Sequence, residues 1–180
     1  MVEDITAFQT PRIINGINNY VEKQGYAVIL NNMSLLEKTG NHYSELSSYQ
    51  SAISKSIKLF NKTQIDGLVY VAMHDRDVME LIPKLSIPIV LVYCYDTSKN
   101  NYYVTYDNVD VIVDVAECLM KRGNEKIGVI KGAEDSLPSQ KRLKSFITQL
   151  KKEGKELKEE YIFPGAWEFD DGVKAYERYK

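Results

Sequence analysis

Apolar positions along the chain follow two alternating periods. Apolar residues spaced three and four positions apart are typical of amphipathic helices, and short continuous apolar runs are typical of strands buried on both faces. The spacing predicts helices near residues 13–25, 46–60, 78–82, 107–122, 143–150 and 170–180. The apolar runs predict strands near residues 26–30, 65–72, 87–93, 102–106, 127–130 and 161–163. Because strands that alternate with helices form βαβ units, we predict an α/β fold with parallel sheets and right-handed crossovers.

Several predicted boundaries coincide with cap and turn residues. Gly25 and Gly123 each follow a helical stripe, as expected of C-terminal glycines, and Asp107 precedes the second of those stripes. The turn-rich stretch 96–101 divides the pattern into two parts. In parallel sheets of this kind, ligands bind outside the carboxyl ends of the strands, so function is to be sought in the loops that follow them.

Composition narrows the class of protein. The 180 residues are 44% hydrophobic and include 13 Tyr and 5 Phe, which favours a packed globular core. A formal net charge of −2 gives no global electrostatic reason to bind nucleic acid. No apolar window is long enough to span a membrane, and residues 1–4 do not resemble a secretory signal. Two cysteines, Cys94 and Cys118, are too few for a disulfide scaffold. From these observations together we expect a soluble, cytoplasmic protein.

Motifs for enzymatic chemistry are missing from the sequence. There is no G-x-G-x-x-G, no phosphate-binding P-loop and no G-x-S-x-G elbow. His42 and His74 share no metal-ligand spacing, and each is interpreted as a lone surface histidine. We therefore predict no catalytic residue, metal or cofactor, and no enzyme. A flavodoxin-like or nucleotide-dependent enzyme would require a phosphate loop after the first strand, and residues 6–11 contain no glycine.

Nine short strings follow one another in a characteristic order and spacing: 3–6, 13–17, 24–26, 65–69, 87–90, 106–108, 119–123, 126–132 and 142–146. Together they resemble the effector-binding domain of the LacI/GalR family of bacterial transcription regulators. The resemblance implies the periplasmic-binding-protein type I fold, in which two Rossmann-like lobes enclose a ligand cleft. Residues 1–101 would then form the N-terminal lobe, and residues 102–180 the crossover and the first part of the C-terminal lobe.

The chain departs from the family pattern at several positions. Asn124 stands where the family usually has His, Ser145 replaces a usual Gly, and Gln9 and Thr10 replace an aromatic pair. By the family's arrangement, a helix-turn-helix and most of the first strand would precede Met1, and further strands would complete both lobes after residue 180. We therefore expect a fragment of a regulator, or a shortened gene product, with an incomplete second lobe.

The resemblance also assigns ligand-binding positions to this chain: Gln9, Thr10, Asp110, Ser136, Arg142 and Trp167. A sugar requires an aromatic face for its C–H side and fixed donors and acceptors for its hydroxyls. Arg142 offers a five-donor fork, and Asp110 an acceptor near the positive end of a helix. Simpler interpretations stay open, because Arg142 can be a surface arginine and Trp167 a core residue. Asp107 is better interpreted as a helix cap than as a ligand group.

The resemblance implies that the chain is the ligand-sensing domain of a LacI-type transcription regulator. A sugar or sugar derivative would bind between the lobes and shift their open and closed populations. In an intact homodimer, that shift would alter how two helix-turn-helix heads meet operator DNA. The alternative is a solute-binding protein of a sugar transporter, which shares the fold but would need a signal peptide or lipid anchor.

Overall fold

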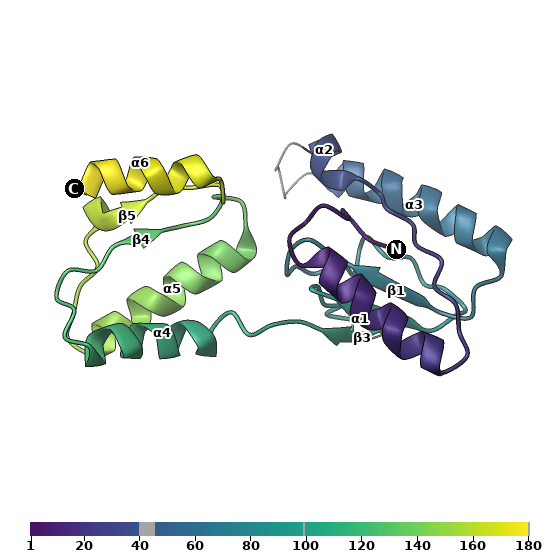
Figure 1. Ribbon diagram of the computed structural model, residues 1–180, viewed down its shortest axis with the longest axis horizontal. Coiled ribbons are helices and arrows are strands. Elements are labelled where there is room, and N and C mark those ends of the chain that lie inside the picture. Colours follow the sequence, from purple (N-terminus) through teal and green to yellow (C-terminus); the bar gives the residue numbers. More distant parts are fainter. Residues whose placement is uncertain (40–45, 99, 180) are drawn as a thin grey trace. The chain divides into compact units, whose positions relative to one another are not determined.

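Two parallel sheets organise the part of the chain that the structure describes (Figure 1). The computed structural model describes residues 1–39, 46–98 and 100–179, so His42 lies outside the described residues. The chain divides into a first unit, Met1–Tyr106, and a second unit, Asp107–Lys180. The boundary between residues 101 and 102 that the sequence indicates stays a prediction about the lobes.

The first unit is built on a three-stranded sheet with the order β1-β2-β3. Its strands are β1 (Leu68–Val71), β2 (Ile89–Val92) and β3 (Tyr102–Val104). All pairs are parallel, with Leu68 opposite Ile89 and Val90 opposite Tyr102. This confirms the predicted parallel sheet, and the continuous apolar runs of β1 and β2 reflect burial on both faces. The three residues of β3 are exposed.

The predicted strand at residues 26–30 is wrong, because those residues pair with no strand in the described structure. Val2 lies between the two neighbouring segments and forms one parallel bridge with Asn32 and another with Val71. Its amide donates to the carbonyl of Asn31 at 2.9 Å. Residues form a strand only where they hydrogen-bond to a neighbouring strand. The pairing with Val2 begins at Asn31 and Asn32, just after residues 26–30.

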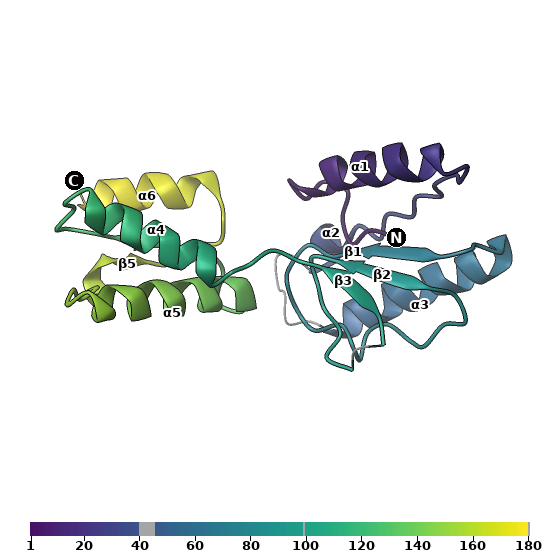
Figure 2. The same cartoon turned by 90° about the horizontal axis from the view of Figure 1, so that it is seen from below.

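Three helices flank the first sheet: α1 (Thr10–Lys23), α2 (Leu35–Thr39) and α3 (Leu46–Thr63). In Figure 2, α1 lies on one side of the sheet and α3 on the other. The α1 helix begins with Pro11 in its first turn and ends before Gly25, whose φ of 82° suits a glycine. The apolar stripe of α3 packs against β1 and β2 in the main core. The sequence pattern did not predict the short α2 helix.

The predicted helix near residues 78–82 is a turn. The amides of Leu81 and Ile82 both donate to the carbonyl of Val78, at 2.9 and 3.0 Å. A parallel bridge between Asp77 and Tyr95 fixes the start of the segment. Pro83 has no backbone N–H, so it cannot donate the next bond that a helix requires.

The second unit contains a two-stranded parallel sheet, β4 (Val129–Ile130) with β5 (Ile162–Phe163). Its helices are α4 (Asp110–Lys121), α5 (Leu137–Lys152), the short 3-10 helix η1 (Glu159–Tyr161) and α6 (Phe169–Tyr179). Their apolar faces meet in a small core centred on Ala116, Phe146, Leu150 and Leu157. Each of the elements predicted after residue 107 is therefore present, although α5 begins six residues earlier than its apolar stripe suggests.

Two cap residues set the starts of α4 and α5. The Asp107 carboxylate accepts hydrogen bonds from the amides of Val109 at 2.7 Å and Asp110 at 3.0 Å, as a capping role requires. Those two bonds hold the pKa of Asp107 below its usual value. Ser136 caps α5 by accepting from the amide of Ser139. Across the described residues, no helix combines the length and apolarity that crossing a membrane requires.

Candidate functional site

The candidate residues lie in the loops that follow the strands of each sheet. In the first unit, Glu3 follows the paired Val2, and residues 73–76 follow β1. In the second unit, Gly132 follows β4 and Trp167 follows β5. The carboxyl ends of parallel strands are the edge at which such folds bind ligands, so these loops define one candidate surface on each unit.

Arg142 and Asn108 form the central polar contact of the second unit. Nε of Arg142, in α5, donates a hydrogen bond to Oδ1 of Asn108 at 2.7 Å. Asn108 is 5% exposed and lies just before α4, whereas Arg142 is half-buried. The guanidinium is planar, so a hydrogen bond donated by Nε also fixes the orientation of its other N–H donors. The contact therefore orients Arg142, in the second turn of α5, toward the start of α4.

Trp167 lies against the loop after β4. A Cβ atom added to Gly132 would fall 2.3 Å from Cε2 and Cζ2 of the indole, so the ring covers bare glycine backbone. The residue is 46% exposed, which leaves part of the ring at the surface rather than in the core. Its φ of 66° is unusual for a residue with a side chain. A half-exposed ring held in a strained backbone is a typical feature of a binding loop.

Asp171 holds the loop that carries Trp167. Its Oδ2 accepts hydrogen bonds from the amides of Ala166 at 2.5 Å and Glu168 at 3.3 Å. The bond from Ala166 is the main reason that the pKa of Asp171 lies below its usual value. The two residues that flank Trp167 are thus anchored to the first turn of α6.

The remaining second-unit predictions lie at the starts of helices. Ser136 is 1% exposed, and its hydroxyl accepts from the amide of Ser139 at 3.4 Å, so its visible role is the cap of α5. Asp110 is exposed in the first turn of α4, where a carboxylate suits the positive end of the helix dipole. Binding of a ligand by either residue stays a prediction.

Gln9 and Thr10 lie at the start of α1 in the first unit. Nε2 of Gln9 donates to the carbonyl of Met73 at 3.2 Å, which ties it to the loop after β1. Thr10 is 1% exposed, and its amide donates to the carbonyl of Ala7 at 2.9 Å. Gln9 therefore lies at the carboxyl edge of the sheet, and Thr10 is packed beneath the surface. Their roles in binding stay predictions.

A buried charged cluster in the first unit was not predicted from the sequence. The Glu3 carboxylate is fully buried and accepts from the guanidinium of Arg76, the hydroxyl of Tyr70 and the amide of Met73, the last at 2.8 Å. The Arg76 guanidinium lies 3.9 Å from the ring centre of Tyr49. Burial, together with the Glu3 charge, raises the pKa of Tyr70 well above its usual value. Such a network fixes the loops that carry it.

A sequence signal for this cluster exists. Glu3 comes directly after the apolar pair Met1 and Val2, and Arg76 comes three residues after the apolar run that ends at Met73, at the edge where parallel strands end. Asp75, 4% exposed, accepts from the hydroxyl of Thr105 at 3.0 Å and so joins the end of β1 to the end of β3. Within the described ranges, no three His, Cys, Asp or Glu residues are grouped as a metal site.

Comparison with known families decides between the hypotheses. Residues 10–178 match the family described as periplasmic binding proteins and sugar binding domain of LacI family. The chain belongs to this family. The match spans nearly all of both units, and the family fold of parallel α/β sheets agrees with the two sheets described above. The family predicted from the nine sequence strings is thereby confirmed.

Similar proteins are transcription regulators. Catabolite control protein A from Priestia megaterium is 22% identical over 99% of this chain and 50% of its own length. The HTH-type transcriptional repressor PurR from Mannheimia succiniciproducens is 24% identical over 97% of this chain and 50% of its own length. A transcriptional regulator CelR–cellobiose complex superposes with a TM-score of 0.69 at 18% identity, covering 98% of this chain and 53% of that chain.

The chain spans about half the length of the curated relatives that it matches. These relatives are regulators rather than transport proteins or enzymes, which supports an effector-binding domain over the solute-binding alternative.

Proposed function

We propose that the chain binds a small sugar-like effector and serves as the ligand-sensing part of a LacI-type transcription regulator. The observation that carries this proposal is the hydrogen bond that orients Arg142 of α5 on Asn108, just before the start of α4. Its geometry prepares a planar set of donors before any ligand arrives. Preorganised donors lose less freedom on binding than a mobile side chain does.

The exposed face of Trp167 supplies the second element of sugar recognition. A flat aromatic ring covers the C–H face of a sugar, and a guanidinium donates to its hydroxyl or anionic oxygens. Asp110, Ser136, Gln9 and Thr10 complete the proposed binding set. The carboxylate of Asp110, the amide of Gln9 and the hydroxyls of Ser136 and Thr10 would add acceptors and donors.

In the proposed regulator, the effector acts by changing the relative populations of the open and closed arrangements of the protein. It binds one arrangement of the protein better than another, and the difference in affinity shifts their equilibrium. In an intact homodimer, that shift changes how paired helix-turn-helix domains fit operator half-sites in the cytoplasm. Neither a cofactor nor a metal enters this scheme.

Calorimetric titration tests the proposal on the 180-residue chain with cellobiose, ribose, galactose and glucose 6-phosphate. Binding of one of these is expected to change the emission of Trp167, the single tryptophan of the sequence. Arg142→Ala should weaken that binding by roughly 10- to 150-fold, since a charge-assisted hydrogen bond contributes ~1.5–3 kcal/mol.

A matched control is Arg122→Ala, which removes an exposed guanidinium at the end of α4. It should bind like the unaltered chain. Tight binding that leaves Trp167 emission unchanged and survives Arg142→Ala would show that the assigned site is wrong.

A further inference from the structure

Acidic residues outnumber basic ones at the carboxyl edge of the second sheet. Three segments reach this edge: residues 107–110 at the start of α4, residues 131–142 after β4 and residues 164–171 after β5. They contain seven acidic and three basic residues. The opposite edge, formed by residues 121–128 and 152–161, contains five acidic and six basic residues. The negative charge of the second unit is therefore concentrated on the side of the proposed effector site.

The first unit shows the same bias at the carboxyl edge of its own sheet. Residues 3–9, 73–78 and 93–98 contain five acidic residues and one basic residue, Arg76. Arg76 is 6% exposed and pairs with the buried Glu3, so its charge is neutralised inside the unit. Together, the edge segments of the two units hold twelve of the 25 acidic residues of the chain and four of its 23 basic residues.

The basic residues of the second-unit edge offset little of its negative charge. Lys131 forms an ion pair with Glu134. Hydrogen bonds from backbone amides hold the pKa of Asp107 and of Asp171 below the usual value, so both carboxylates are ionised at neutral pH. Arg142 therefore presents its donors within a surrounding of net negative charge.

Helix dipoles account for only part of this bias. Carboxylates suit the first turn of a helix, and α4 and α6 both begin with them. The α5 helix, however, has no acidic residue in its first turn. In the first unit, Asp75, Asp77 and Asp96 lie in loops outside the helices. The bias is therefore a property of the two edges rather than of helix starts alone.

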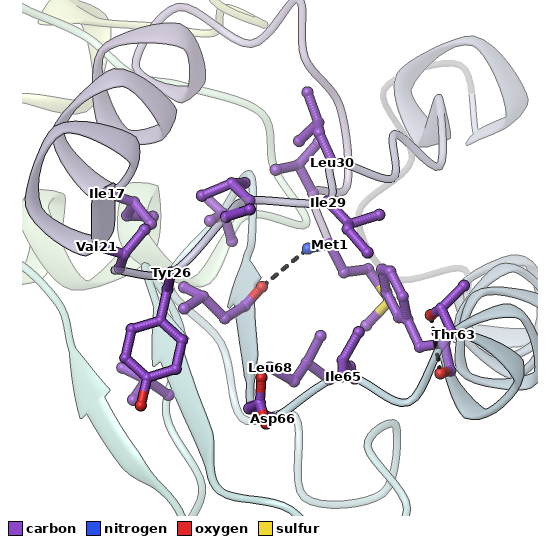
Figure 3. A pocket seen from close by; sticks show the side chains of 18 of the residues that line it. Met1, Ile17, Val21, Tyr26, Ile29, Leu30, Thr63, Ile65, Asp66 and Leu68 are labelled. Carbon is purple, nitrogen blue, oxygen red and sulfur yellow. Dashed lines mark hydrogen bonds between the residues drawn. The ribbon is translucent and has the colours of Figure 1, made fainter. Parts of the chain in front are cut away.

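The apolar cavity of the first unit differs from these edges (Figure 3). Its volume is about 590 Å³, and Ile17, Val21 and Leu30 are among the lining residues that Figure 3 labels. Among the described residues that line it, Asp66 carries the one charged side chain. The hydroxyl groups of a sugar would find few hydrogen-bond partners there, and burying them unpaired costs free energy. The charged edges are therefore the better place to ask which sugars the chain accepts.

We propose that the effector site selects sugars without negative charge, so that neutral and amino sugars bind and phosphorylated or acidic sugars are rejected. This inference rests on the proposed function, because it names the chemical class of the ligand at the same site. Loops that carry one sign of charge create a potential that concentrates ligands of the opposite sign. A phosphate monoester carries about −1.5 to −2 charges at neutral pH, so this potential repels it.

Quenching of Trp167 fluorescence tests the local charge without any ligand. Trp167 is the single tryptophan of the sequence and is 46% exposed, so ions in solution reach it. Iodide and caesium are compared at one ionic strength, each relative to its quenching of uncharged N-acetyltryptophanamide. Caesium is expected to quench about threefold better on this scale, since a potential of roughly −0.5 kT separates the two ions by that factor. Equal quenching, or better quenching by iodide, would overturn the proposal.

Two charge reversals in α6 locate the effect. Asp170→Lys reverses an exposed charge three residues after Trp167, and Glu177→Lys reverses an exposed charge near the other end of the helix. Asp170→Lys should raise iodide quenching about twofold, whereas Glu177→Lys should leave it unchanged. Circular dichroism verifies that both variants fold. Equal effects would show that iodide responds to the net charge of the chain, which contradicts a negative edge.

Calorimetric titration with three matched sugars tests the class of ligand. Glucose, 6-amino-6-deoxyglucose and glucose 6-phosphate share one ring and differ only at carbon 6. At low salt, glucose 6-phosphate should bind about tenfold more weakly than the other two. The gap should narrow in 0.5 M KCl, where the screening length is about 4 Å. A gap that salt does not change would mean steric exclusion, and tighter binding of the phosphate would mean attraction, so each result contradicts the proposal.

The two measurements separate failure of this inference from failure of the proposed function. If no sugar binds, cellobiose, ribose and galactose included, while caesium is the better quencher, the negative edge is confirmed and the proposed function is wrong. If a phosphorylated or acidic sugar binds best, the proposed function stands and the selection against negative charge is wrong.

Discussion

Arg142 and Asn108 are 34 positions apart in the sequence, and one hydrogen bond of 2.7 Å joins Nε of the first to Oδ1 of the second. The bond connects α5 to the residue pair that opens α4. It therefore couples the orientation of a proposed ligand-binding side chain to the packing of the second unit.

A double-mutant cycle should detect that coupling. Arg142→Ala and Asn108→Ala are each expected to lower the free energy of unfolding, and the double variant should lose less than the sum. The expected coupling is ~1 kcal/mol, because Arg142 is partly open to solvent and screening weakens its bond. Urea unfolding of the four proteins measures it, and strict additivity would contradict a direct interaction.

Gly132→Ala should displace the indole of Trp167. The new methyl group would lie 2.3 Å from two ring carbons, which forces the ring away from the loop after β4. We expect a shift in tryptophan emission and weaker sugar binding. Gly172→Ala is the matched control in α6, where nothing lies within 4 Å of the added atom. It should leave the emission unchanged and stabilise the helix by ~0.5–1 kcal/mol.

Glu3→Gln should destabilise the first unit strongly. The change leaves the buried Arg76 guanidinium without its counter-charge, and breaking a buried pair in this way costs about 3–5 kcal/mol. Glu134→Gln breaks the pair between Lys131 and a carboxylate that is 82% exposed, so it should change stability by about 1 kcal/mol or less. Chemical denaturation that finds equal effects for the two variants would contradict the role of the buried cluster.

Acid should weaken the first unit through Asp4. Burial raises the pKa of Asp4, but hydrogen bonds from the hydroxyl and amide of Thr6 and the amide of Leu36 outweigh it and bring the pKa below the ordinary 3.8. Because the pKa of Asp4 is lower in the folded state, the stabilisation that its charged form provides is fully present above the ordinary pKa of 3.8. That stabilisation is lost as the pH falls through the folded-state pKa.

Unfolding measured between pH 5 and pH 2.5 should therefore show a steeper loss of stability in the unaltered chain than in Asp4→Asn, which has no charge to titrate. Identical slopes in the two proteins would show that the hydrogen bonds to Asp4 contribute nothing.

Local pattern predicted the elements that depend on nearby residues. The apolar run of β1 identifies a strand, and the cap at Asp107 and the glycine at 123 enclose α4 as expected. Residues 26–30 have the same apolar pattern as β1 but form no ladder, because a strand also depends on its neighbour. The sequence pattern holds no information about which neighbour is present.

The candidate site was predictable to a similar extent. The resemblance singled out Arg142 and Trp167, whereas the contacts that hold them, from Asn108 and Asp171, are visible only in three dimensions. The pair of Glu3 and Arg76 spans 73 positions, so no spacing rule for helices or strands could have linked the two residues.

The division at Tyr106 and Asp107 has a practical consequence. Each unit is one uninterrupted stretch of chain, so a single peptide bond separates the two. Cleavage at that bond keeps β3 with β2 and keeps the Asp107 cap with α4. The two stretches can therefore be produced as separate polypeptides and ligated, with an isotopic label in one of them alone. Spectra of such a ligated protein would follow the Trp167 loop without signals from the first unit.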